Sequence, residues 1–133
     1  MLYSKCTVKP ESKLYQKFKK NTPSILWSRL ESWSSFGVPD LLGYNNLCGF
    51  FMVELKFTQS NKIKFSPHQI LFHTTRTERN FILIEQAHRA PRSTVKLFAS
   101  SEINNLLTGI DKAAPLAVDD FKLITKILIN QKN

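Results

Sequence analysis

Two carboxylates and one lysine are spaced so that they could share a single site. Asp40 ends a Gly37-Val38-Pro39 turn, and Glu54 and Lys56 follow within an apolar stretch. Because side chains alternate along a β-strand, Glu54 and Lys56 would point to the same face, which Asp40 could reach from a partner strand. Burying this acid and this amine in a small core is costly unless they serve a function. The three residue types predict a hard-cation site with a general base beside it.

A β-hairpin is the element expected to position these residues. Asp40–Tyr44 and Gly49–Phe57 are typical strand sequences, and Asn45-Asn46 supplies the turn residues between them. The alternative interpretation is an ordinary ion pair between Glu54 or Asp40 and Lys56 on an exposed sheet face.

The rest of the chain predicts an α/β domain with a central mixed β-sheet of about five strands flanked by α-helices. Helices are expected over Glu11–Lys20, from Ser66-Pro67 to about Arg79, over Ser100–Leu107, and from Asp119 or Asp120 onward. Further strands are expected over Ile25–Ser32, Phe81–Gln86 and Thr94–Ala99. The Ser66 helix would join the Glu54 strand to the Phe81 strand, which makes these two strands candidate parallel neighbours.

Length and composition favour one folded domain of 133 residues, with 42% apolar residues. We expect its core over about residues 11–99 and a helical extension over about 100–133. No apolar run is long enough to span a bilayer, and the first residues have no signal-peptide character. Cys6 and Cys48 lie in unlike contexts, which indicates free thiols, a cytoplasmic location and no zinc site.

The net charge of +9 favours an anionic partner, and nucleic acid is the commonest one for a basic domain. The alternative is a soluble basic protein whose lysines only solvate its surface. An apolar stripe of Phe121, Ile124 and Leu128 on the last expected helix either packs on its own core or forms a dimer interface.

The combination Pro39-Asp40, Glu54-Leu55-Lys56 resembles the signature of the PD-(D/E)XK nucleases. More narrowly, the Gly-x-Pro-Asp turn, the Glu-x-Lys strand and Gln69 on the following helix are similar to the VRR-NUC branch, whose small members occur in bacteriophages. Their core is similar to that of archaeal Holliday junction resolvases. The resemblance covers roughly Glu11–Ala99.

The resemblance implies a restriction-endonuclease-like core and a Mg²⁺-dependent site, in which Mn²⁺ would substitute. Asp40, Glu54 and the Leu55 carbonyl would supply oxygen ligands. Lys56 would orient or deprotonate the attacking water, and two nearby carboxylates raise its pKa and so favour the orienting role. Gln69 would reach that water or Lys56. Glu11 and Glu31 compete for the role of a further acidic residue that completes the site.

Basic residues outside the motif are candidate phosphate contacts. They are Arg29, Lys17, Lys19, Lys20, Lys62, Lys64, Arg76 and Arg79. The Thr58–Phe65 segment would lie beside the site as a loop able to clamp a strand. His68 and His73 do not have the spacing of a zinc-binding helix, so we expect no ligand role for them.

The sequence thus predicts a phage-type, Mg²⁺-dependent DNA endonuclease that is selective for branched DNA such as Holliday junctions. Resolving a junction by paired cuts would need a homodimer. Two alternatives remain: a nonspecific or nicking nuclease that degrades host DNA, and a catalytically silent DNA-binding module that keeps the nuclease fold.

Overall fold

A six-stranded mixed β-sheet organises the chain, with the spatial order β1-β2-β3-β4-β5-β6. This computed structural model describes residues 9–30 and 37–130. The strands are β1 (Leu26–Arg29), β2 (Leu41–Asn45), β3 (Gly49–Thr58), β4 (Asn80–Ala87), β5 (Ser93–Ala99) and β6 (Ala117–Val118). β3 and β4 pair in parallel, as the sequence predicted, and the other neighbouring strands are antiparallel.

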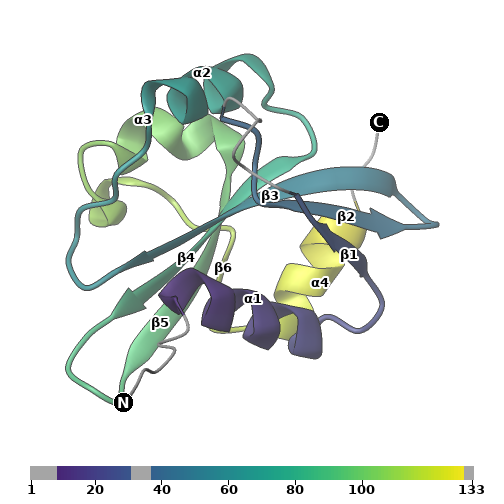
Figure 1. Cartoon of the computed structure of the whole chain (residues 1–133), viewed down its shortest axis with the longest axis horizontal. Helices are drawn as coiled ribbons and strands as arrows, with labels where there is room; N and C mark the ends of the chain where they lie inside the picture. Colours follow the sequence, from purple (N-terminus) through teal and green to yellow (C-terminus); the bar gives the residue numbers. More distant parts are fainter. Residues whose placement is uncertain (1–8, 31–36, 131–133) are drawn as a thin grey trace, which may run out of the picture.

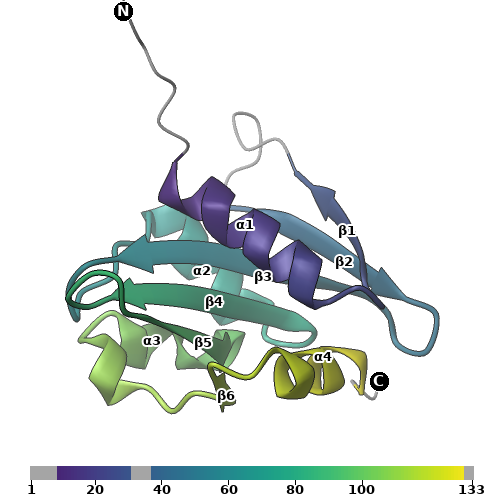
Figure 2. The ribbon, with the colours of Figure 1, turned by 90° about the horizontal axis from the view of Figure 1, so that it is seen from below.

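Four α-helices cover the two faces of this sheet: α1 (Pro10–Asn21), α2 (Pro67–Thr75), α3 (Ile103–Leu106) and α4 (Phe121–Ile129). In Figure 1, α1 and α4 lie on one side of the sheet, and α2 and α3 lie on the other. Figure 2, which views the molecule from below, shows α1 lying across β3. The prediction of a mixed sheet flanked by helices is therefore confirmed.

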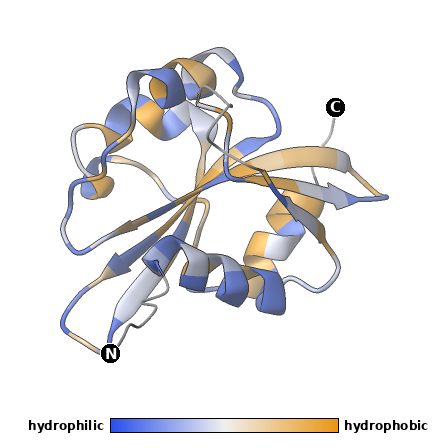
Figure 3. Cartoon of the chain, viewed as in Figure 1, coloured by the Kyte–Doolittle hydropathy of each residue, from blue (hydrophilic) through white to orange (hydrophobic). Residues whose placement is uncertain are grey.

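Each face has its own apolar core. The core under α1 and α4 contains Leu14, Phe18, Phe51 and Val53, whereas the core under α2 and α3 contains Ile82, Ile84 and Phe98. Figure 3 shows the apolar colouring concentrated on the central strands, with polar residues on the outer side of α1. The alternation along β3 sends Val53 and Leu55 into the first core, and it leaves Glu54 and Lys56 on the second face.

The structure differs from the predicted elements at several places. The sheet gains β6, whose two residues are too few to give a sequence signal. α2 ends at Thr75 rather than near Arg79, because Arg76 leaves the helical region with φ −131° and ψ 80°, and Arg79 takes a left-handed φ of 58°. The predicted Ser100 helix begins as a 3₁₀ segment, Ser100–Glu102, and continues as α3.

β1 is shorter than the predicted strand, starting at Leu26 and ending at Arg29. The last two positions of the predicted strand, 31 and 32, lie outside the described residues, as does Cys6. Cys48 is a buried free thiol.

The stripe on α4 packs on the protein's own core. Ile124 and Leu128 are completely buried there, and Phe121 packs against the same cluster. This stripe is therefore not a dimer interface, because its apolar side chains are already covered. Residues after Ala99 contribute to both cores, through α4 on one face and through Ile103 and Leu106 on the other. None of the described helices has the length and apolar character needed to cross a membrane.

Candidate active site

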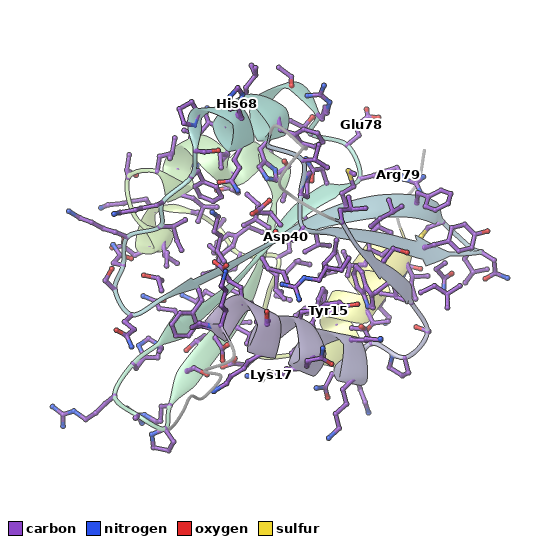
Figure 4. All side chains as sticks on the ribbon, viewed as in Figure 1. Tyr15, Lys17, Asp40, His68, Glu78 and Arg79 are labelled. Atoms are coloured by element: carbon purple, nitrogen blue, oxygen red, sulfur yellow. The ribbon has the colours of Figure 1, made fainter. Side chains whose placement is uncertain are left out.

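The Gly-Val-Pro turn brings Asp40 against the start of α2. Gly37 has a left-handed φ of 78°, and a Cβ atom at this position would lie 2.2 Å from the backbone oxygen of His68. Only glycine permits this close approach of two backbones. Pro39 is buried in the same turn. The turn therefore fixes Asp40 next to the helix that bears Gln69, and Figure 4 shows Asp40 near the centre of the molecule between α2 and α1.

Asp40 lies where the pairing between β2 and β3 ends. Its Oδ2 accepts a hydrogen bond of 2.8 Å from the backbone N–H of Leu55. The β2–β3 register ends at the pair Leu41 and Val53, so Leu55 has no strand partner on that side. Since the N–H and C=O groups of one strand residue point toward the same neighbouring strand, the Leu55 carbonyl lies on the edge that Asp40 occupies.

Glu54 is buried, with 2% of its surface exposed. Its Oε2 accepts a hydrogen bond of 3.1 Å from Gln69 Nε2 and lies 3.9 Å from Lys56 Nζ, while its Oε1 has no partner. Burial, followed by the nearby charge of Asp40, raises the pKa of Glu54 to about 9, although the Lys56 charge opposes the shift. Without a cation, Glu54 is therefore mainly in its neutral form near pH 7.

The Gln69 amide joins the acid to the lysine. Its Oε1 accepts hydrogen bonds from Lys56 Nζ at 3.1 Å and from the Ser66 N–H at 3.0 Å. Ser66 Oγ in turn accepts from the Gln69 N–H, which completes a capping box at the start of α2. The side chain that begins the helix is thus the same one that orients Glu54 and Lys56.

Lys56 is held from a second side by an aromatic ring. Its Nζ lies 4.9 Å from the ring centroid of Phe65, a cation–π distance. The sequence analysis did not predict this contact, because a phenylalanine nine positions from a lysine carries no signal of proximity.

A cavity of about 480 Å³ opens beside Lys56 at the end of β3. Glu11 lines this cavity from α1, and its charge contributes to the raised pKa of Glu54. The structure thus brings Glu11 toward the predicted site. Glu31, the competing acid, lies outside the described residues.

The donor set fits a small divalent cation. Among residues 9–30 and 37–130, no cluster of three or more His, Cys, Asp or Glu side chains is arranged to hold a metal ion. Asp40 and Glu54 supply two carboxylates, and the unpartnered buried Oε1 of Glu54 lacks a cation or a donor to satisfy it. Two carboxylates with a carbonyl suit Mg²⁺, which keeps several waters and takes further ligands from substrate phosphates.

Two of the predicted phosphate contacts lie at the site. Lys62 and Lys64 line the same cavity as Lys56, on the segment after β3. Asn61 anchors this segment by donating to Asp111 at 2.7 Å, and Ile63 is buried in the second core. Lys62 and Lys64 therefore lie on an anchored backbone segment, in the cavity beside Lys56.

The other predicted contacts do not line this cavity. Lys17 pairs with Glu85 at 3.0 Å, Lys19 lies over the Tyr15 ring, and Lys20 is exposed in the last turn of α1. Arg29 donates to Ser12 Oγ, and Arg76 lies over the Phe72 ring. Arg79 donates to the backbone oxygens of Cys48 and Phe50, where it holds the start of β3 (Figure 4).

A buried polar cluster lies behind the site and has a structural role. His73 Nδ1 is within hydrogen-bonding distance of Ser100 Oγ and Asn80 Nδ2, and the His73 ring packs against Phe65. Burial, assisted by the Lys56 charge, lowers the pKa of His73 to about 4. His73 is therefore neutral near pH 7, and among the described residues it belongs to no group of three or more His, Cys, Asp or Glu side chains that could hold a metal ion.

The comparisons with known proteins find similarity in structure but not in sequence. No protein-family model matches the chain, and no curated protein matches it in sequence. Among solved structures, the chain is similar to Hjc, a Holliday junction resolvase from the archaeal hyperthermophile Archaeoglobus fulgidus, with 18% sequence identity and a TM-score of 0.47. The match covers 67% of this chain and 72% of that chain.

Proposed function

We propose that the protein is a divalent-metal-dependent DNA endonuclease. The observation that carries this proposal is a cluster on and beside β3: the Gln69 amide joins Glu54 to Lys56, and Asp40 accepts from the N–H of Leu55, the residue between them. The charge of +9 and the lysines on the same cavity suit a polyanionic substrate. An isolated surface ion pair does not explain a carboxylate with 2% exposure and one unpartnered oxygen.

Asp40 and Glu54 would hold Mg²⁺, together with the Leu55 carbonyl. When bound, this ion would position the scissile phosphate and lower the pKa of a water molecule. Asp40 is already oriented by the Leu55 N–H, and Glu54 by Gln69, so little reorganisation is needed.

Lys56 would donate hydrogen bonds to the attacking water or to a phosphate oxygen as negative charge develops. Gln69 Oε1 accepts from the amine, which orients Nζ beside Glu54. We therefore assign Lys56 an orienting and electrostatic role. Lys62 and Lys64 would contact phosphates next to the scissile bond.

The test is cleavage of labelled DNA by the wild type and by two isosteric variants, Asp40→Asn and Glu54→Gln. Each variant should lose at least about a hundredfold in Mg²⁺- or Mn²⁺-dependent rate, because each removes an anionic ligand. Glu78→Gln makes the same chemical change at an exposed position and should cleave at the wild-type rate. Wild-type activity in both site variants would refute the assignment, and an inactive wild type would favour a silent DNA-binding module.

Selectivity for branched DNA is the finer part of the proposal, and it is supported by the motif resemblance. A matched set of four-way junctions, flaps and linear duplexes tests it, since a nonspecific nuclease would cut all of them at similar rates. Symmetric junction cleavage also needs two sites in one dimer. A solution mass of one chain at micromolar concentration, with and without a junction, would contradict paired cutting.

A further inference from the structure

A second cavity, of about 470 Å³, lies at the same end of the sheet but on the face covered by α1. Its walls come from the start of α1, the ends of β3 and β4, and the connection between β4 and β5, and Figure 1 shows this connection near the start of α1. The alternation along β3 places Phe57 on this face and Lys56 on the other. The cavity therefore does not belong to the carboxylate site.

The lining combines apolar surfaces with basic side chains. Pro10, Phe57 and Pro91 supply apolar walls, while Lys13 and Arg92 supply cations. Within the part of the chain that the structure describes, no carboxylate pairs with either cation. Both side chains are exposed at the rim, so they are available to an anion that enters from solvent.

The one acid in this lining is already neutralised. Glu85 Oε2 accepts from Lys17 Nζ at 3.0 Å and from Ser93 Oγ at 2.8 Å. Because this ion pair cancels the Glu85 charge, Lys13 and Arg92 give the cavity a net positive charge. A neutral apolar ligand or an organic cation fits such a lining poorly, whereas a ring that carries a phosphate matches both parts of it.

The two cavities meet at the end of β3. Phe57 lines both of them, and Lys56, its neighbour in the strand, lines the cavity of about 480 Å³. A DNA strand whose phosphate lies at Glu54 and Lys56 could therefore pass over the end of β3 and place a neighbouring nucleotide in the second cavity. A paired base could not enter, because both of its faces are stacked within the duplex.

We propose that this cavity binds an unpaired nucleotide of the DNA substrate, with the base against Phe57 and the prolines and the phosphates at Lys13 and Arg92. This inference rests on the proposed function for its assumption that DNA is the substrate. It assigns the preference for non-duplex DNA to a site separate from the catalytic carboxylates.

The experiment measures binding without cleavage. Fluorescence anisotropy in EDTA would compare a blunt duplex with the same duplex carrying a three-nucleotide single-stranded overhang, in both polarities. The test variant is Lys13→Glu with Arg92→Glu. The control is Lys122→Glu with Lys126→Glu on α4, which changes the net charge equally at exposed positions outside the cavity. A third variant, Ala90→Trp, obstructs the cavity without changing charge.

We expect the wild type to bind one overhang polarity at least about fivefold more tightly than the blunt duplex. The Lys13/Arg92 variant should lose this ratio, and its salt slope should fall by about 1.4 for two lost single-strand phosphate contacts. The α4 variant should keep the ratio, and Ala90→Trp should reduce it.

Equal effects of the two charge variants, an unaltered ratio in Ala90→Trp, or no overhang preference in the wild type would each overturn the proposal. Cleavage in Mg²⁺ is measured separately. Overhang binding without any cleavage would support the cavity and refute the nuclease function, and cleavage without overhang preference would do the reverse.

Discussion

Replacing Glu54 with glutamine should stabilise the metal-free protein at alkaline pH while it abolishes cleavage. The carboxyl is 2% exposed, and its pKa is raised from 4.5 to about 9, chiefly by burial and then by Asp40. A group whose pKa is higher in the folded state than in the unfolded state stabilises the fold most at pH values below its unfolded-state pKa. This stabilisation is lost as the pH rises toward the folded-state pKa. The glutamine amide removes this titration and keeps the shape.

The magnitude follows from the size of the shift. At about 1.4 kcal/mol per pH unit, the wild type should lose about 4 kcal/mol between pH 5 and pH 8 relative to Glu54→Gln. That difference corresponds to roughly 10 °C in Tm for a domain of this size. His73, whose pKa is lowered to about 4, weakens the fold below pH 6.5, but it does so equally in both proteins and cancels in the comparison.

The assay is urea unfolding of both proteins in EDTA at pH 5 and pH 8, repeated with Mg²⁺. The free energy of unfolding of the variant should increase relative to that of the wild type as the pH rises. Mg²⁺ should stabilise the wild type much more than the variant. Glu78→Gln serves as the control and should follow the wild type at both pH values. A Glu54→Gln protein that is equally destabilised at pH 5 and pH 8 would show that Glu54 is ionised without metal, and it would refute the reasoning.

Three further predictions follow from the same contacts. Lys56→Met should keep Mg²⁺-dependent stabilisation but lower the cleavage rate by a factor of about 10²–10⁴. Calorimetry and cleavage assays would separate the two effects, and a wild-type cleavage rate would show that Lys56 has no part in the mechanism. Gln69→Leu should destabilise the fold by about 1 kcal/mol and also lower the cleavage rate. Ser66→Ala should destabilise the fold by a similar amount with a smaller loss of cleavage rate. Equal losses of cleavage rate in the two variants would mean that Gln69 acts only through the capping box of α2. Gly43→Ala should destabilise by at least about 2 kcal/mol in urea, because the new methyl would lie 2.6 Å from the Phe51 ring, and an unchanged midpoint would contradict this packing.

The sequence predicted the site best where local geometry determines it. Asp40 lies immediately before β2, and Glu54 and Lys56 lie on β3, which a short turn joins to β2. Strand alternation alone places Glu54 and Lys56 on one face. Gln69 was predictable because Ser66-Pro67 starts a helix at a defined position. These four residues come together in the structure with little dependence on the rest of the chain.

The remaining features depend on contacts between distant parts of the chain. The burial of Glu54, the Phe65 ring over Lys56, and the positions of Lys13 and Arg92 at a second cavity arise only when α1, α2 and the β4–β5 connection pack on the sheet. The pairing of Lys17 with Glu85 spans 68 positions and likewise has no local signal. The short β6 depends on a register with β5 that two residues cannot encode alone.

The Gln69 side chain couples the assembly of the candidate site to the opening of a helix end. Its Oε1 accepts from the Ser66 N–H and from Lys56, so opening the first turn of α2 withdraws the amide that aligns Lys56 with Glu54. Helix ends open far more often than a protein unfolds globally. Amide hydrogen exchange at Gln69 would therefore report the fraction of molecules in which the site is momentarily disassembled. Metal or DNA that binds the assembled site should slow that exchange before it changes the exchange of the central strands.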